Sequence, residues 1–151
     1  MKTLSNNSDR QEIETRIERL SPTDVAHWGK MSVHQMVCHL NDSYLYALGE
    51  KQASFQSGLF QRTVMKWFAL EVPLRWPRGV PTRPEMEQGK GGTKPVEFSQ
   101  DRAALAASLN RFCDQLPQPA LQHPTFGPMT PADWLRWGYL HADHHLRQFG
   151  R

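Results

Sequence analysis

The chain has little cysteine and no long apolar run, which argues against a disulfide-stabilised protein and against a membrane-spanning one. Only two cysteines occur, Cys38 and Cys113, and neither belongs to a C-x-x-C pair. Two thiols do not form a disulfide framework, so we expect buried free thiols in a reducing compartment. No apolar run approaches the roughly 20 residues of a membrane-spanning helix, and the first residues lack the apolar centre of a signal peptide. These absences predict a cytoplasmic protein with no membrane partner.

Strong charge of either sign is also missing. The chain has 18 Lys and Arg against 15 Asp and Glu, a formal net charge of +3. The basic residues are scattered rather than arranged in a stripe, and no recognition motif for DNA or RNA occurs, so we expect no nucleic-acid partner. The sequence GKGG at 89–92 lacks the glycine spacing and the Lys-Ser/Thr pair of a phosphate loop.

Helical periodicity accounts for most of the chain, and no segment shows the alternation of a strand. With 151 residues, 38% hydrophobic and 22% charged, the chain suits a single globular domain, residues 1–151. Amphipathic helices of this kind bury their apolar stripes most simply in a bundle. The prediction is an all-α four-helix bundle with one short extra helix and a long Pro/Gly-rich loop at 73–98. The expected helices cover 9–20, 33–48, 59–70, 100–116 and 131–149.

Four details of these helices follow from the sequence. Ser8 and Asp9 are expected to start the first helix, and Ser99 is expected to cap the fourth. Pro117 and Pro119 should end that fourth helix. The short third helix carries an apolar set of its own: Phe60, Val64, Trp67 and Phe68.

The loop at 73–98 is too rich in Pro and Gly to be a regular helix. Unstructured loops of this length are uncommon in compact domains and often have a function. The simpler interpretation is a solvated surface loop, and the alternative is a lid that binds anions. The alternative depends on its basic residues, which are Arg75, Arg78, Arg83, Lys90 and Lys94.

The last helix has clear ends and two histidines in the middle of its apolar stripe. Thr130 is a good N-cap, Pro131 suits the first helical position, and Gly150 can close the helix. At about 100° per residue, His141 and His145 lie one turn apart and face the same way as Trp134, Trp137, Gly138, Gln148 and Phe149. Buried imidazoles need polar partners. Each histidine therefore has its own hydrogen bond, or both share a metal ion.

A third ligand is available on the second helix. His39 lies at the edge of that helix's apolar stripe, about 60° from Met36 on the wheel. It is reachable from the core and lies on a border where a cleft can open. Asp42 is expected to point further outward, and His34 is expected to lie on the opposite, solvated side.

Two stretches, WGKMSVHQMVCHL and LHADHHLRQFGR, together resemble the DinB-like (YfiT-like) superfamily of metal-binding four-helix bundles. The resemblance covers most of the chain. It implies that His39, His141 and His145 bind one divalent metal, with zinc and nickel the commonest. Gln148 matches the glutamine that follows the family's last ligand, and it is expected to orient a ligand or a bound water. His144 is not at a family ligand position, and it is expected to support the ligands, face a substrate or be solvated.

Three imidazoles leave a coordination position open, which is typical of catalytic rather than structural zinc sites. Characterised relatives of the superfamily include enzymes that use low-molecular-weight thiols. The resemblance thus implies a metal-dependent thiol S-transferase that acts on a small electrophilic molecule.

Two other functions stay open. One is metal-dependent hydrolysis, for which Asp42 or His144 would have to act as the base, because no Glu lies near the ligands. The other is a non-catalytic dimerisation or scaffold module, a homodimer in which exposed tryptophans such as Trp76 form the interface.

Overall fold

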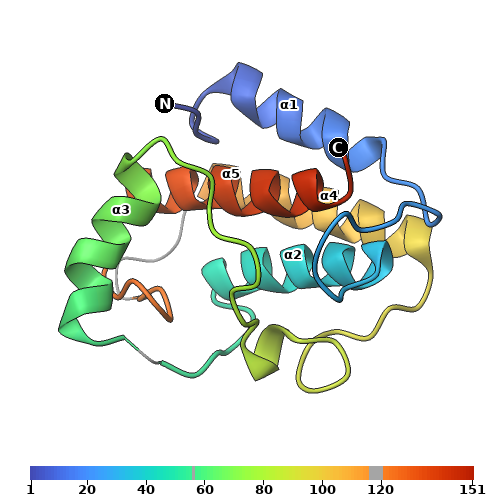
Figure 1. Ribbon diagram of the computed structural model, residues 1–151. Coiled ribbons are helices and arrows are strands. Elements are labelled where there is room, and N and C mark those ends of the chain that lie inside the picture. Colours follow the sequence, from blue (N-terminus) through green and yellow to red (C-terminus); the bar gives the residue numbers. More distant parts are fainter. Residues whose placement is uncertain (56, 116–120) are drawn as a thin grey trace.

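Helices make up the regular structure of this protein, as the sequence predicts. A computed structural model describes residues 1–55, 57–115 and 121–151. Within those ranges there are only two isolated β-bridges and no strand. None of the helices described there combines the length and apolar character needed to cross a bilayer. The helices are α1 (Asn7–Glu18), α2 (Val33–Ala47), α3 (Lys66–Glu71), α4 (Phe98–Gln115) and α5 (Pro131–Gln148), with a π-helical turn at Gln61–Met65 and a 3-10 turn at Pro84–Met86 (Figure 1).

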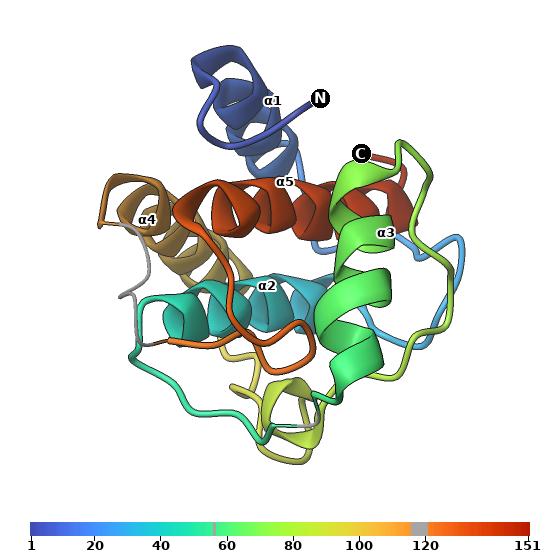
Figure 2. The same ribbon diagram turned by 90° about the vertical axis from the view of Figure 1, so that its left-hand side faces the viewer.

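The last helix, α5, lies at the centre of the fold. Figures 1 and 2 show α1 along one side of α5, α2 and α4 along the other, and α3 across one end. The predicted apolar face of α5 is buried except for the partly exposed His141, and Tyr139 and Leu146 outside that face are buried as well. On the α1 side, Arg16 of α1 bonds Asp143 at 2.8 Å. A helix covered on two sides has to bury more than the single stripe that its periodicity predicts.

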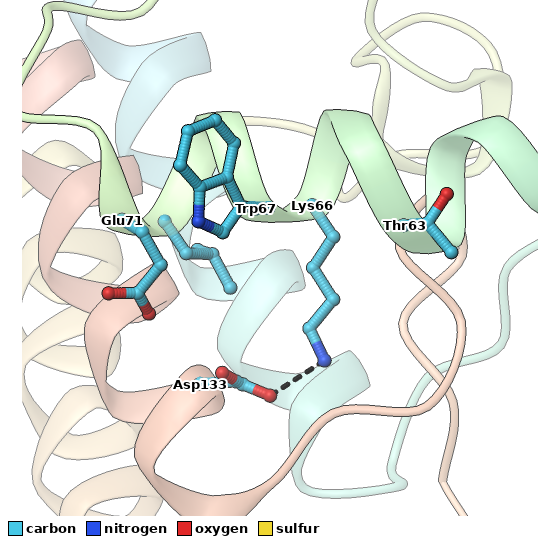
Figure 3. A pocket seen from close by; sticks show the side chains of 6 residues that line it. Thr63, Lys66, Trp67, Glu71 and Asp133 are labelled. Atoms are coloured by element: carbon cyan, nitrogen blue, oxygen red, sulfur yellow. Dashed lines mark ion pairs between the residues drawn. The ribbon is translucent and has the colours of Figure 1, made fainter.

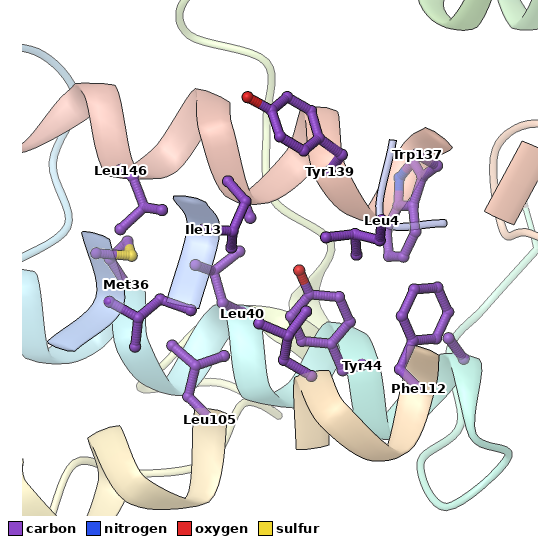
Figure 4. Close-up of a cluster of buried hydrophobic side chains, with 14 of the residues drawn as sticks. Leu4, Ile13, Met36, Leu40, Tyr44, Leu105, Phe112, Trp137, Tyr139 and Leu146 are labelled. Atoms are coloured by element: carbon purple, nitrogen blue, oxygen red, sulfur yellow. The ribbon is translucent and has the colours of Figure 1, made fainter. Parts of the chain in front are cut away.

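The hydrophobic core fills the space between these four longer helices. Figure 4 shows side chains from α1, α2, α4 and α5 interdigitating in one cluster. Phe112 of α4 packs against Tyr44 of α2, with ring centroids 5.2 Å apart. Tyr44 also donates a hydrogen bond of 3.1 Å to the carbonyl of Gly138, which ties α2 to α5. The largest fully buried side chains include Trp134, Tyr44, Phe112, Ile13, Ile17, Leu20, Met36 and Leu40.

Helix ends agree with the sequence at α2 and α5 and differ at α1 and α4. Ser32 and Thr130 both form capping boxes, and Gly150 has a φ of +71° after α5. The predicted start of α1 at Ser8 and Asp9 is wrong, because the earlier Asn6 side chain accepts from both of their amides. An N-cap of this kind satisfies otherwise unpaired amides of the first turn.

At α4 the predicted Ser99 cap is wrong as well. The helix begins at Phe98, and the Glu97 carboxylate accepts the amides of Ser99 and Gln100. The Glu97 carboxylate, in front of the helix, thus takes the capping role that the sequence predicts for Ser99. Leu116 and the predicted stops at Pro117 and Pro119 lie outside the described residues.

An ion pair fastens the short helix α3 to the start of α5. Lys66 lies 2.7 Å from Asp133 (Figure 3). Lys66 also donates a bond of 2.9 Å to the carbonyl of Pro128. Arg136 of α5 also donates to the carbonyl of Leu70. A small cavity of about 210 Å³ lies beside this contact and contains no histidine. These polar contacts hold α3 even though much of its apolar surface is exposed.

The loop at 73–98 is built into the fold and is only partly the solvated loop that the sequence favours. Met86, in its 3-10 turn, is 6% exposed. The amide and hydroxyl of Thr93 donate to Asp42 at 2.8 and 2.6 Å, and Lys51 pairs with the same carboxylate at 2.9 Å. Asp42 is 0% exposed, so the expectation that it points outward is wrong. The loop supplies the partners that allow this carboxylate to be buried.

Gly138 should be a position where alanine destabilises the protein despite its higher helix propensity. A Cβ there would lie 2.7 Å from a Phe112 ring carbon and 2.9 Å from a Leu4 methyl. Overpacking of a core costs about 1–3 kcal/mol, more than the roughly 1 kcal/mol that alanine gains over glycine in a helix. Urea unfolding of Gly138→Ala should therefore show lower stability.

The control is the same change in a Phe112→Leu background, where the clashing ring is gone. There Gly138→Ala should cost clearly less, as a double-mutant cycle would report. A stabilised Gly138→Ala protein in the native background would contradict the close approach.

Candidate metal centre

Three histidines from two helices meet beside α5. His39 of α2 and His141 and His145 of α5 each place one ring nitrogen within 4.8 Å of the others. The closest pair is His39 Nε2 and His141 Nε2, at 3.2 Å. His39 and His145 are 6% and 8% exposed, and His141 is partly exposed. The structure thus brings together the three residues that the sequence selects.

The second nitrogen of two of these rings is already bonded to the protein. His39 Nδ1 lies 3.1 Å from the carbonyl of Met86, which only accepts, so Nδ1 carries the proton. Gln148 Nε2 donates to the carbonyl of Trp28, and its Oε1 therefore faces His145 Nδ1 at 3.1 Å. In both rings the Nδ1–H is the donor, and a lone pair is left on Nε2.

Gln148 is held in place by the segment before α2. The Gln148 side chain donates from Nε2 to the Trp28 carbonyl at 2.6 Å, and the Gln148 backbone carbonyl accepts from the His27 amide at 2.8 Å. Gly29 has a φ of +84°, and a Cβ there would lie 2.4 Å from Gln148 Nε2. The glycine of the W-G-K-M-S motif is therefore needed for the glutamine to approach the backbone.

The chemistry and spacing of the three rings suit a shared divalent metal. Zn–N bonds of about 2.0–2.1 Å in a tetrahedron separate two ligand nitrogens by about 3.3 Å, close to the 3.2 Å between His39 and His141. Without a metal, the hydrogen-bonding groups of the three neutral rings are poorly satisfied. Since His39 and His145 carry their protons on Nδ1, only His141 can place a proton on Nε2, between the other rings' lone pairs. The Nδ1 of His141 is then buried without a partner among the described residues. A metal accepts all three lone pairs at once.

Burial keeps the cluster neutral. It lowers the pKa of His39, and it lowers those of His141 and His145 well below the ordinary value of 6.5. For His141 and His145 the neighbouring imidazoles add to the effect, since a second positive charge nearby is unfavourable. Neutral rings are the form that binds metal ions.

The supporting residues named from the sequence have different surroundings. Gln148 contacts a cluster histidine, as described above. His144 stacks edge-on against His145, with centroids 5.2 Å apart, and its Nδ1 is buried without a partner among the described residues. Asp42 is engaged by Thr93 and Lys51 and makes no hydrogen bond to the three histidines. Because those two partners hold its carboxylate, Asp42 is a poor base for this site.

Trp76 covers the cluster and is not an exposed surface residue, so that expectation is wrong. Its ring lies 6.2 Å from those of His141 and His144, and its indole N–H donates to the carbonyl of Ala69. Arg78, two residues later, lies over the Trp28 ring at 4.3 Å. The loop after α3 thus closes over the histidines by aromatic and cation–π contacts.

A cavity of about 1080 Å³ opens beside the three histidines. This volume is slightly above the usual range for ligand pockets, about 300–1,000 Å³. One wall is the apolar face of the turn and helix at α3: Phe60, Val64 and Phe68 line it and are 60%, 53% and 49% exposed. The charged side chains of the lining are mostly basic, with one acid: Lys30, Arg75, Arg83, Lys90 and Glu87. An apolar molecule with a negative group fits this lining.

His123 is a residue of this cavity that the sequence analysis did not identify. It is 8% exposed, and its ring stands between Phe126, Trp134 and Trp137. Trp137 in turn stacks on His141, with centroids 5.1 Å apart. The signal that could have found it is the sequence HPTFG at 123–127, because a histidine at the first position of a Pro/Gly turn can cap the turn's amides.

A second cluster, formed by His34, Cys38 and Asp101, is explained by hydrogen bonds. His34 Nε2 lies 2.7 Å from the Asp101 carboxylate, so the expectation of a solvated His34 is wrong. The amide of Val96 also donates to this carboxylate. Burial and the nearby Asp101 raise the pKa of the Cys38 thiol to about 12, so it remains protonated. The three side chains join α2 to the start of α4.

His123 should make the stability of the metal-free protein depend on acidity. Burial, then Arg83 and Lys66, lower its pKa from 6.5 to about 3. Below pH 6.5, His123 binds a proton in the unfolded chain but stays neutral in the folded chain. Its contribution to the free energy of unfolding is therefore fully present above pH 6.5 and is lost as the pH falls toward 3. The slope reaches about 1.4 kcal/mol per pH unit for one such group.

Urea unfolding at about pH 7 and about pH 5 would measure the effect against His123→Asn. The amide oxygen of asparagine can replace Nδ1 in the turn, but asparagine does not titrate. The wild type should lose about 2 kcal/mol more than this variant between the two conditions. Equal losses would show that His123 is protonated as readily in the folded chain as in the unfolded one.

Comparison with known proteins identifies a family but no activity. No curated protein and no solved structure matches the chain. One family, described as "Protein of unknown function (DUF1569)", matches residues 4–151. The match spans nearly the whole sequence, including all three cluster histidines and His123, and the chain therefore belongs to the DUF1569 family.

Proposed function

We propose that this protein is a divalent-metal enzyme, with zinc or nickel held by His39, His141 and His145. The observation that carries the proposal is the pair of fixed tautomers: Met86 and Gln148 take the Nδ1 protons of His39 and His145. Metal-binding histidines usually donate their second nitrogen to such an acceptor, which orients the ring and raises its basicity. We also propose that the fold is a DinB-like bundle, on the motifs described above.

The reaction that we propose is transfer of a low-molecular-weight thiol to a small electrophile. Three protein ligands leave one side of the site toward the cavity, and a bound divalent metal lowers the pKa of a thiol or water that it coordinates. The sulfur forms a bond to the electrophilic carbon, and the leaving group departs with the bonding electrons. The thiol proton passes to His144 or to solvent. Trp76 and Trp28 limit access of bulk water.

Hydrolysis is the second candidate, and one observation favours it. His144 Nδ1 is buried, has no partner among the described residues, and belongs to a ring beside His145. Burial lowers the pKa of His144. A neutral imidazole there can accept a proton from an attacking water. Thiol transfer remains the first candidate because an acidified thiol requires no such base.

Removal of one ligand should abolish metal binding. Wild-type protein, purified without a tag and incubated with zinc, should hold close to one metal per chain by mass spectrometry, and His141→Ala should hold almost none. Metal that binds the native state raises its melting temperature, so added zinc should stabilise the wild type and leave His141→Ala unchanged. His144→Ala is the matched control, because it removes a neighbouring imidazole and keeps all three ligands. A wild type that takes up neither zinc nor nickel would refute the proposal.

Gln148→Leu should weaken zinc binding by about 10–100-fold, the usual effect of losing an outer partner of a metal ligand. The reason is that His145 then loses the acceptor for Nδ1–H. Competition with a zinc chelator would measure the change. Gln11→Leu, on the exposed side of α1, makes the same chemical change away from the site and should bind zinc like the wild type. Unchanged affinity in Gln148→Leu would mean that His145 does not depend on this glutamine.

A further inference from the structure

The loop at 123–127 is built to hold one imidazole in one orientation. His123 and Gly127 exchange two backbone hydrogen bonds of 2.8 Å, which closes the turn. The amides of Thr125 and Phe126 both donate to His123 Nδ1, at 3.2 and 3.1 Å. The ring is also stacked on Phe126, with centroids 4.7 Å apart. Backbone, hydrogen bonds and stacking therefore all fix the same rotamer.

The two amide bonds also determine where the proton of this ring lies. An Nδ1 that accepts from two N–H groups has no proton, so in the neutral ring Nε2 carries it. His123 lines the large cavity, and no acceptor for Nε2 occurs among the described residues. Because burial keeps the ring neutral, Nε2–H remains a donor, and it can never become an acceptor while the turn is intact.

The surroundings of His123 favour a negatively charged acceptor. Arg83 lies close enough to lower the pKa of the ring. The guanidinium of Arg83 bonds only neutral oxygens among the described residues, the carbonyls of Ser54 and Pro124 and the hydroxyl of Thr125. The guanidinium forms no ion pair among the described residues, and Glu85 is close enough to interact with its charge without a direct bond. A carboxylate near His123 would gain both a hydrogen bond and this field.

The rest of the cavity suits an apolar body. Phe60, Val64 and Phe68 form one wall, and Trp137 lies between His123 and His141. A ligand that reaches from His123 to the three histidines passes the Trp137 ring, and the apolar side chains at α3 line the same cavity. Exposed aromatic surface of this kind is costly in water and is stabilised by an apolar ligand.

We propose that His123 is a ligand-binding residue whose Nε2–H donates a hydrogen bond to the carboxylate of an amphipathic acid. The apolar body of this acid lies along α3, and its far end lies at the three-histidine cluster. The inference rests on the proposed function, in that it names the class of the electrophilic substrate of that site. It adds a second polar anchor to the cavity, separated from His141 by the ring of Trp137.

The test uses sebacate, an apolar chain with a carboxylate at each end, and the zinc-loaded full-length protein in calorimetric titrations. His123→Asn keeps an acceptor where Nδ1 stands and removes the Nε2 donor. His123→Gln removes the Nδ1 acceptor and keeps a donor near Nε2. Because His123→Asn loses a hydrogen bond to a charged group, we expect it to bind sebacate about tenfold more weakly. His123→Gln should retain most of the affinity and lose thermal stability.

Three further measurements decide the outcome. The first is the zinc content of each variant, which separates this inference from the metal proposal. Normal zinc content with weakened sebacate binding in His123→Asn supports the inference. That result does not depend on whether the protein is a thiol transferase. Wild-type affinity of sebacate for a folded His123→Asn protein would overturn it. Failure of suberate, sebacate and dodecanedioate alike to bind the wild type would overturn the ligand class. Loss of zinc in His141→Ala with sebacate still bound at His123 would localise the anchor away from the metal.

Discussion

The side-chain amide of Gln148 is the interaction on which the candidate site depends. Gln148 is 3% exposed, and its amide joins two parts of the chain: it contacts the ring of His145 within α5 and the carbonyl of Trp28 in the segment before α2. Because the Trp28 carbonyl only accepts, the amide has one allowed orientation, and that orientation fixes the His145 tautomer. The need for glycine at position 29 follows from the same contact, because a Cβ there would overlap the Gln148 amide. One buried amide thereby couples the fold of a loop to the chemistry of a histidine.

Local sequence pattern was enough to predict the three cluster histidines, and the reason is geometric. His141 and His145 are one turn apart on a long helix with strong end signals, and His39 lies at the stripe edge of another. Helical periodicity reports which residues face the core, so it brings such groups together without knowledge of the packing. The all-helical fold class and the ends of α2 and α5 could also be predicted, because both depend on patterns that are local in the sequence.

Residues placed by long-range contacts were not predictable in this way. Asp42 is buried because Thr93 and Lys51 reach it, and Trp76 covers the cluster because a Pro/Gly-rich loop turns back over α5. His123 is defined by amides in its own turn, but its relation to the cavity depends on Trp137. No periodicity links these residues, since loops have no repeat from which to infer a facing side.

The arrangement of polar and apolar groups argues for a ligand at this site rather than a purely structural core. A structural core would favour apolar side chains where this protein buries three imidazoles, because each buried polar group costs free energy unless it is fully bonded. The protein supplies partners for two of the rings and leaves lone pairs facing one point. It also leaves Phe60, Val64 and Phe68 uncovered beside them. Both features are unfavourable in the free chain. A metal bound by the lone pairs and an apolar ligand on the exposed side chains would relieve both.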